Sequence, residues 1–137
     1  MSFDAFVTAA VIRYPFLWSR QAESGETEGR KSRPVAVGFR AQRVTGDVLW
    51  LFPITSQPPP EGRLVASIPA TEKRRAGLDL DVPLWIILDE LNEDVIGESV
   101  YLEPNAVMGR FSRAFFIPLM KRVFAVRERT RVVNRVP

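Results

Sequence analysis

The sequence predicts a mainly β protein, built as a small, strongly curved antiparallel sheet or barrel with one C-terminal helix. Several short apolar segments alternate with turn signals, which is typical of a sheet made of hairpins. One segment near the C-terminus instead repeats its apolar residues every three or four positions, which is the period of a helix. The chain has 137 residues, of which 46% are hydrophobic. This is enough for a single domain with its own core, and we expect one domain over residues 1–137.

The expected strands are residues 10–18, 34–44, 48–54, 63–68, 83–91 and 93–104. In the first of them, Pro15 indicates a bulge or a sheet edge. The second and third read as the two arms of a hairpin, joined by a turn at residues 45–47. Pro53 cannot donate a hydrogen bond from its backbone, so it predicts an edge or bulge at the end of the second arm. Thr55 and Ser56 should then be exposed.

Two helices are expected. One or two helical turns should begin near Pro69 and end at Gly77, which can terminate a helix. The longer helix should begin after Ser112, whose hydroxyl can cap it. Its apolar positions are Phe115, Phe116, Leu119, Met120, Val123 and Phe124. Pro118 falls inside this pattern and should kink the helix or shift its start.

The rest of the chain is expected to be loop and tail. Residues 19–33 contain no large apolar side chain, so they predict an exposed loop, and a loop this long is either functional or mobile. Beyond Arg127 the chain is basic and is expected to fray. The folded core should therefore span residues 10–127, followed by a basic tail at residues 128–137.

Composition excludes several classes of function. The chain has no cysteine and no histidine, so zinc, haem and iron–sulfur sites are not expected, and neither are Cys-His or Ser-His catalytic pairs. We expect no metal and no cofactor, and an enzyme of this composition must work with carboxylates, hydroxyls and arginines. No apolar segment is long enough to span a membrane, and the N-terminus lacks the pattern of a signal peptide. The expected location is the cytoplasm.

Charge is unevenly distributed along the chain. Residues 76–109 contain eight acidic residues and no lysine or arginine. Basic residues gather instead at residues 30–43, 73–75 and 121–135. Clustered cations of this kind indicate a polyanion as partner, because binding releases counterions from phosphates. On charge alone, the simpler interpretation is that these clusters are solvated faces of the protein.

Five motifs occur in order along residues 14–127: Leu-Trp at 17–18, "GRKSRP" at 29–34, "PITSQPPPEG" at 53–62, "IPATEKRRAGLD" at 68–79 and "WIILDELN" at 85–92. Together they resemble the PemK/MazF family of toxins, in particular a group of short PemK-like proteins. The resemblance implies the toxin of a type II toxin–antitoxin pair with an SH3-like barrel. It also implies a homodimer that cleaves single-stranded RNA at short sequences without a metal, and an antitoxin protein that inhibits it.

The resemblance also implies a site. Arg33 matches the arginine of the family's Arg-Pro motif, and its planar set of donors suits a phosphate that gains charge in the transition state. Thr55 and Ser56 match the family's Thr-Ser pair and can donate hydrogen bonds to the same oxygens. Glu28 stands where other members carry a loop glutamate, as a general base or as a contact to an RNA base.

Further residues are expected to bind RNA. The residues assigned to this role are Arg30, Lys31, Gln57, Glu90 and Asn92. Arg30 and Lys31 would hold the phosphate backbone, while Glu90 and Asn92 match a Glu-x-Asn of the short group. Trp18, Phe39 and Trp50 are candidate surfaces for base stacking.

The sequence also departs from the family. Some members carry an arginine late in the sheet, where this chain has Leu88. A non-catalytic module that binds RNA or protein therefore stays open as an alternative. A third interpretation is a gyrase-poisoning toxin of the CcdB type, but that group ends in Trp-Gly-aliphatic, whereas this chain ends in "VVNRVP".

Overall fold

The computed structural model describes residues 2–29 and 31–136. The strands in this part of the chain are β1 (Ala10–Tyr14), β2 (Arg33–Ala41), β3 (Val48–Thr55), β4 (Val65–Ser67), β5 (Trp85–Ile87), β6 (Glu90–Val95), β7 (Val107–Arg110) and β8 (Arg131–Asn134). They form one sheet in the order β4-β5-β3-β2-β1-β7, to which β6 is joined through β3, and β8 through β6. All pairs are antiparallel except β6 and β8, which are parallel.

Side chains alternate between the two faces of the sheet along each strand, and each face is buried in a core of its own. The core on one face, which packs against the C-terminal helix, includes Val11, Ala36, Phe52, Phe116 and Met120. The core on the other face includes Ile12, Tyr14, Val35, Leu49 and Leu51. Neighbouring residues of one strand thus enter different cores. This explains why β1 to β3 read as nearly continuous apolar segments.

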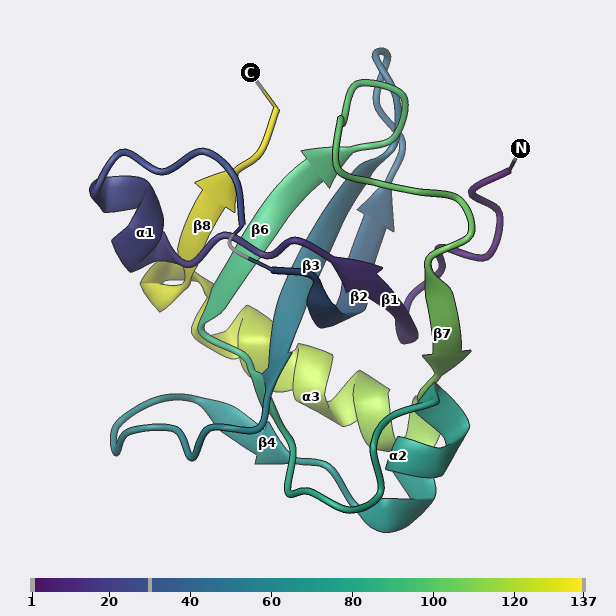
Figure 1. Cartoon of the computed structure of the whole chain (residues 1–137), viewed down its shortest axis with the longest axis vertical. Helices are drawn as coiled ribbons and strands as arrows, with labels where there is room; N and C mark the ends of the chain where they lie inside the picture. Colours follow the sequence, from purple (N-terminus) through teal and green to yellow (C-terminus); the bar gives the residue numbers. More distant parts are fainter. Residues whose placement is uncertain (1, 30, 137) are drawn as a thin grey trace.

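In the described residues, three α-helices flank the sheet: α1 (Ser19–Glu23), α2 (Ala70–Ala76) and α3 (Arg113–Ala125), the last followed by a 3-10 turn at Arg127–Arg129. Figure 1 shows α3 crossing one side of the strands, α2 beside β7 and α1 beside β8. The Ser112 hydroxyl accepts a hydrogen bond from the backbone N–H of Phe115 and so caps α3. Both the backbone and the hydroxyl of Ser112 donate to the Glu72 carboxylate. This ties the start of α3 to α2.

The structure confirms the expected class, a mainly antiparallel β sheet with a C-terminal helix. The hairpin of β2 and β3 is present. The short helix runs from its N-cap Pro69 to a left-handed C-cap at Gly77, with a φ of 71°. The long helix contains Pro118 and begins five residues before it, so the proline does not set its start. Within the described residues, no pairing between β4 and β7 closes the sheet into a barrel.

Several local predictions were wrong. Pro53 pairs with Val35 on one side, and on the other side it lies between the residues of β3 that pair with β6 and those that pair with β5. The strand does not end there, because it continues to Thr55, which pairs with Trp85 of β5. Thr55 is consequently buried, while Ser56 is exposed. The single strand expected at residues 83–91 is divided between β5 and β6, and β7 was not foreseen.

The two segments expected to be loop and tail, residues 19–33 and 128–137, each contain a regular element. The residues after Trp18 form α1 before the loop begins. The supposed tail contains β8, which pairs with β6 in register, and its Arg135 is 5% exposed. Within residues 2–29 and 31–136, no helix combines the length and the hydrophobicity that a membrane crossing requires.

Candidate functional site

The register of β2 and β3 brings together the two residues of the Arg-Pro and Thr-Ser motifs. Val35 pairs with Pro53 in antiparallel register. Two residues further out on each strand stand Arg33, the first residue of β2, and Thr55, the last of β3. In an antiparallel pair, residues that are opposite each other project to the same face. This accounts for the twenty-two positions that separate the two motifs in the sequence.

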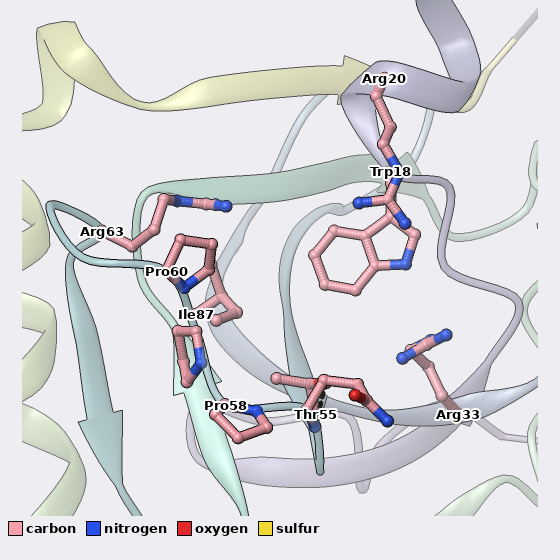
Figure 2. A pocket seen from close by; sticks show the side chains of 10 residues that line it. Trp18, Arg20, Arg33, Thr55, Pro58, Pro60, Arg63 and Ile87 are labelled. Carbon is pink, nitrogen blue, oxygen red and sulfur yellow. Dashed lines mark hydrogen bonds between the residues drawn. The ribbon is translucent and has the colours of Figure 1, made fainter.

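Both residues line one pocket of about 200 Å³. Its lining residues are Trp18, Arg20, Arg33, Thr55, Gln57, Pro58, Pro59, Pro60, Arg63 and Ile87. Figure 2 shows Arg33 on one side of the pocket and Arg63 on the other, with the Trp18 indole between them and Thr55 near Arg33. Three guanidinium groups thus surround one opening. No acidic residue is among the described residues that line it.

Trp18 is flanked by two of these cations. The guanidinium carbon of Arg33 lies 5.3 Å from the centre of the indole and that of Arg20 lies 5.8 Å from it. Burial of the Arg33 guanidinium, and then the charge of Arg20, lowers the pKa of Arg33. The Nε of Arg33 is buried without a hydrogen-bond partner among the described residues. An unpaired buried donor beside a second cation favours the binding of an anion.

Thr55 supplies a hydroxyl next to this cation. Its Oγ1 accepts a hydrogen bond of 3.0 Å from the backbone N–H of Gln57. That bond fixes the oxygen and leaves the hydroxyl hydrogen to be donated elsewhere. Because Thr55 is only 8% exposed, the hydroxyl can reach a ligand only from inside the pocket.

Three polar residues of β6 hold the segment that carries Trp18. Glu90, Asn92 and Asp94 alternate along the strand and so share one face. Glu90 accepts from the backbone N–H of Ser19 at 2.7 Å. Asn92 bonds both the N–H and the carbonyl of Leu17, at 2.8 and 2.7 Å.

The third of these residues completes the support, since Asp94 accepts from the hydroxyl of Tyr14 at 2.7 Å. Desolvation of the phenol, followed by the charge of Asp94, raises the pKa of Tyr14, which therefore stays a donor. Asn92 is fully buried and Glu90 is 3% exposed. The prediction that Glu90 and Asn92 bind RNA is corrected here: burial keeps both from a ligand, and they position Trp18 instead.

Of the other site residues predicted from the sequence, some line the pocket and others lie outside it. Gln57 lines the pocket. Lys31 is exposed and lines a neighbouring depression together with Arg33 and Trp18. Ser56 and Glu28 are exposed and are not among the residues that line the pocket with Thr55. Arg30 lies outside the described residues.

The candidate stacking residues separate in the same way. Trp18 lies in the pocket, whereas Phe39 and Trp50 line a different groove beside Phe124. Phe39 packs against Phe124 with ring centres 4.6 Å apart. The indole nitrogen of Trp50 donates to Glu93 at 3.0 Å. Of the three aromatic residues, only Trp18 therefore lies in the pocket of Arg33.

Arg20, Arg63 and the prolines at residues 58–60 were not foreseen as parts of the site. A run of prolines after a Thr-Ser pair marks a stiff loop, but nothing in the sequence shows that the loop turns back over Trp18. Arg63 reaches the pocket because Asp89 and Glu90, far away in sequence, hold its guanidinium. Only the fold reveals that pairing.

The arrangement is suited to a phosphodiester with an attached base. Cations and a hydroxyl stand at one end, and an indole ring, prolines and Ile87 provide apolar walls. Within the described residues, no group of three or more Asp, Glu, His or Cys side chains is placed to hold a metal ion. Comparison with known proteins found no matching family model, no matching curated protein and no matching solved structure.

Proposed function

We propose that this protein is a metal-independent endoribonuclease of the PemK/MazF toxin type that acts on single-stranded RNA. The observation that carries the proposal is that the β2–β3 register brings Arg33 and Thr55 to the same end of the hairpin, where both line one pocket. A cationic fork and a hydroxyl donor in one pocket are what the dianionic phosphorane of RNA cleavage needs. The five motifs that resemble the family support the same conclusion.

The reaction follows from the chemistry of RNA. The 2′-hydroxyl loses its proton and its oxygen bonds to phosphorus, after which the bond from phosphorus to the 5′-oxygen breaks. The 5′-oxygen takes up a proton, and the products are a 2′,3′-cyclic phosphate and a 5′-hydroxyl. Arg33 stabilises the charge that develops on the phosphorane, and the Thr55 hydroxyl donates to it. Loss of one such donor lowers the rate about a hundredfold or more.

Removal of the 2′-proton falls to solvent hydroxide in this proposal. No acidic residue lines the described pocket, and Glu28 is exposed outside it. The absence of a positioned base in the described site favours one alternative, a module that binds single-stranded RNA without cutting it. The same contacts would hold the phosphate in either case.

The remaining family properties belong to the same proposal. They are closure of the curved sheet as an SH3-like barrel, a homodimer, inhibition by an antitoxin protein and a cytoplasmic location. The antitoxin must compete with RNA for the cationic pocket, so an acidic or aromatic segment is the chemistry expected of it.

The test is to incubate purified protein with a long single-stranded RNA in excess EDTA and to map the ends. Arg33→Ala and Thr55→Ala are compared with Arg113→Ala, which removes an exposed arginine at the start of α3. Discrete cuts that persist in Arg113→Ala and are lost in the other two variants support the enzyme. RNA that is bound with salt-dependent affinity but left intact supports the binding module instead.

A further inference from the structure

Arg63 lines the same pocket as Arg33 but belongs to a different electrostatic environment. Its Nε donates to both oxygens of Asp89, at 3.0 and 3.1 Å, and its Nη2 donates to Asp89 at 2.8 Å. The same Nη2 donates to Glu90 at 3.0 Å. The side chain is only 23% exposed. Arg63 is therefore held rigidly, since its fork is clamped by two carboxylates.

The carboxylates are themselves fixed to the backbone. Asp89 accepts from the N–H of Leu64 at 3.1 Å, and Glu90 accepts from the N–H of Ser19 at 2.7 Å. Burial alone would raise the pKa of Asp89, but hydrogen bonds from Arg63 and Leu64 outweigh it and hold that pKa below its ordinary value. Arg63 consequently projects into the pocket in one orientation.

Formal charge divides the pocket into two ends. At one end, neither Arg33 nor Arg20 forms an ion pair with another described residue. At the other end, one guanidinium faces the two carboxylates of Asp89 and Glu90, so negative groups outnumber positive ones. A phosphate is attracted to the first end and disfavoured at the second. A neutral group is the ligand that fits beside Arg63.

The Arg63 end offers flat apolar walls and a single polar contact. The walls are the Trp18 ring, the prolines at residues 58–60 and Ile87, and Figure 2 shows Pro60 and Ile87 beside Arg63. Nη1 is the nitrogen of Arg63 that bonds to none of the described residues. The whole pocket, with both ends included, has a volume of about 200 Å³, which is below the roughly 300 Å³ at which pockets for drug-sized ligands begin. The Arg63 end is therefore a small space between flat walls, and a single planar ring such as a nucleobase is the kind of group it suits.

We propose that the Arg63 end of the pocket is a nucleobase subsite next to the phosphate held by Arg33, and that Arg63 selects bases with a carbonyl oxygen over adenine. The inference rests on the proposed function for its substrate, single-stranded RNA. A cationic N–H bonds most strongly to a carbonyl oxygen. Guanine and uracil or thymine present such an oxygen where adenine and cytosine present an amino donor, and adenine is the one base with no carbonyl oxygen at all. Stacking on Trp18 holds the base, and Arg63 reads its edge.

Binding tests this subsite without requiring cleavage. Short single-stranded DNA probes, which lack the 2′-hydroxyl and cannot be cut, carry one variable base in an otherwise abasic strand. Wild type should bind the guanine or thymine probe at least about fivefold more tightly than the adenine probe. Arg63→Gln, whose amide both donates and accepts, should lose this preference, and Arg113→Gln should keep it. Equal affinities in wild type, or a preference retained in Arg63→Gln, overturn the subsite.

The salt dependence of binding separates a base contact from a phosphate contact. Removing a phosphate contact flattens the slope of log affinity against log salt by about one unit. We expect this flattening in Arg33→Gln and not in Arg63→Gln. A flatter slope in Arg63→Gln would show that Arg63 binds phosphate and would overturn the assignment. Arg63→Gln takes the guanidinium away from both Asp89 and Glu90, and Glu90 still accepts from the N–H of Ser19. The double variant Arg63→Gln/Asp89→Asn also removes the charge of Asp89, so the test does not depend on the single variant folding.

The two proposals fail separately. A wild type that leaves RNA intact while discriminating between the probes overturns the nuclease and keeps the base subsite. A wild type that cuts RNA with no base preference in the probes keeps the nuclease and overturns the subsite.

Discussion

Arg135, near the end of the chain, donates a hydrogen bond of 2.9 Å from its Nη1 to the side-chain oxygen of Asn92. The same nitrogen donates to the carbonyl of Pro15 at 2.8 Å, and the guanidinium lies 4.0 Å from the centre of the Tyr101 ring. Since Asn92 also holds Leu17, the residue that follows β8 and the segment leading to Trp18 are joined through one buried amide. Arg135 therefore supports the pocket without lining it.

The first prediction concerns the contact between Arg135 and Asn92. Arg135→Ala should lower the free energy of unfolding by about 2 to 3 kcal/mol, because it leaves buried acceptors without their charged donor. Urea unfolding followed by fluorescence measures the change. Arg131→Ala is the matched control, since Arg131 is an exposed arginine of β8, four residues before Arg135, and it should cost less than about 0.5 kcal/mol. Equal effects of the two variants would show that the buried network does not stabilise the fold.

How far the fold could be predicted depended on whether a signal was local. Two apolar segments on either side of a turn identified β2 and β3, and the Ser112 cap and the helical period identified α3. β8 was missed because "RVVNRVP" reads as a short basic tail. The strand depends on pairing with β6, and Arg135, which directly follows it, is buried against Asn92.

The candidate site was foreseen to a similar extent. The motifs identified Arg33, Thr55 and Gln57, which do line one pocket. They misassigned Glu90 and Asn92, because a polar pair at the end of a strand looks the same whether it faces solvent or the backbone of another segment. Pro53 led to the wrong expectation that Thr55 is exposed, because β3 continues past the proline and pairs with β5. Which strands lie beside a proline cannot be read from the residues around it.

The second prediction concerns Gly38, which stands at the register shift between Val37 and Phe39 in β2. A Cβ built there would lie 2.3 Å from Cε2 of Phe52, whose ring is fully buried. Gly38→Ala should therefore destabilise the protein by about 1 to 3 kcal/mol through overpacking. Thermal unfolding measures it.

A double-mutant cycle provides the control for this clash. Phe52→Leu shortens the side chain that the new methyl group meets, so Gly38→Ala should cost less in the Phe52→Leu background than alone. Costs that simply add would mean that the methyl group is not opposed by Phe52.

The third prediction uses the Arg63–Asp89 pair. The pKa of Asp89 in the folded protein lies below its ordinary value of 3.8, so the unfolded chain takes up the proton first as pH falls. The stabilisation by this carboxylate is complete above pH 3.8 and is lost as pH falls from there through the folded pKa. Asp89→Asn should thus be less stable than wild type at pH 7. The difference in the free energy of unfolding between the two proteins should shrink as pH falls below 3.8.

Urea unfolding at a series of pH values measures the gap. Asp81→Asn is the control, because Asp81 is exposed and its substitution should leave a small, nearly constant difference. A gap between wild type and Asp89→Asn that stays constant down to pH 2 would contradict a carboxylate stabilised by Arg63.

The fourth prediction concerns the base that starts RNA cleavage. The proposed nuclease has no acidic residue among the described residues that line its pocket, and Glu28 is exposed. In this proposal, removal of the 2′-proton is therefore assigned to hydroxide. The cleavage rate at saturating RNA should therefore rise about tenfold per pH unit between pH 6 and pH 9. A carboxylate base would instead give a plateau above its own pKa, because it is already ionised there. Initial rates in EDTA across this range measure the slope, and Glu28→Gln should keep it. A plateau in wild type that Glu28→Gln abolishes would assign the base to Glu28. Because Glu28 does not line the pocket, its carboxylate would then have to move towards the pocket when RNA binds.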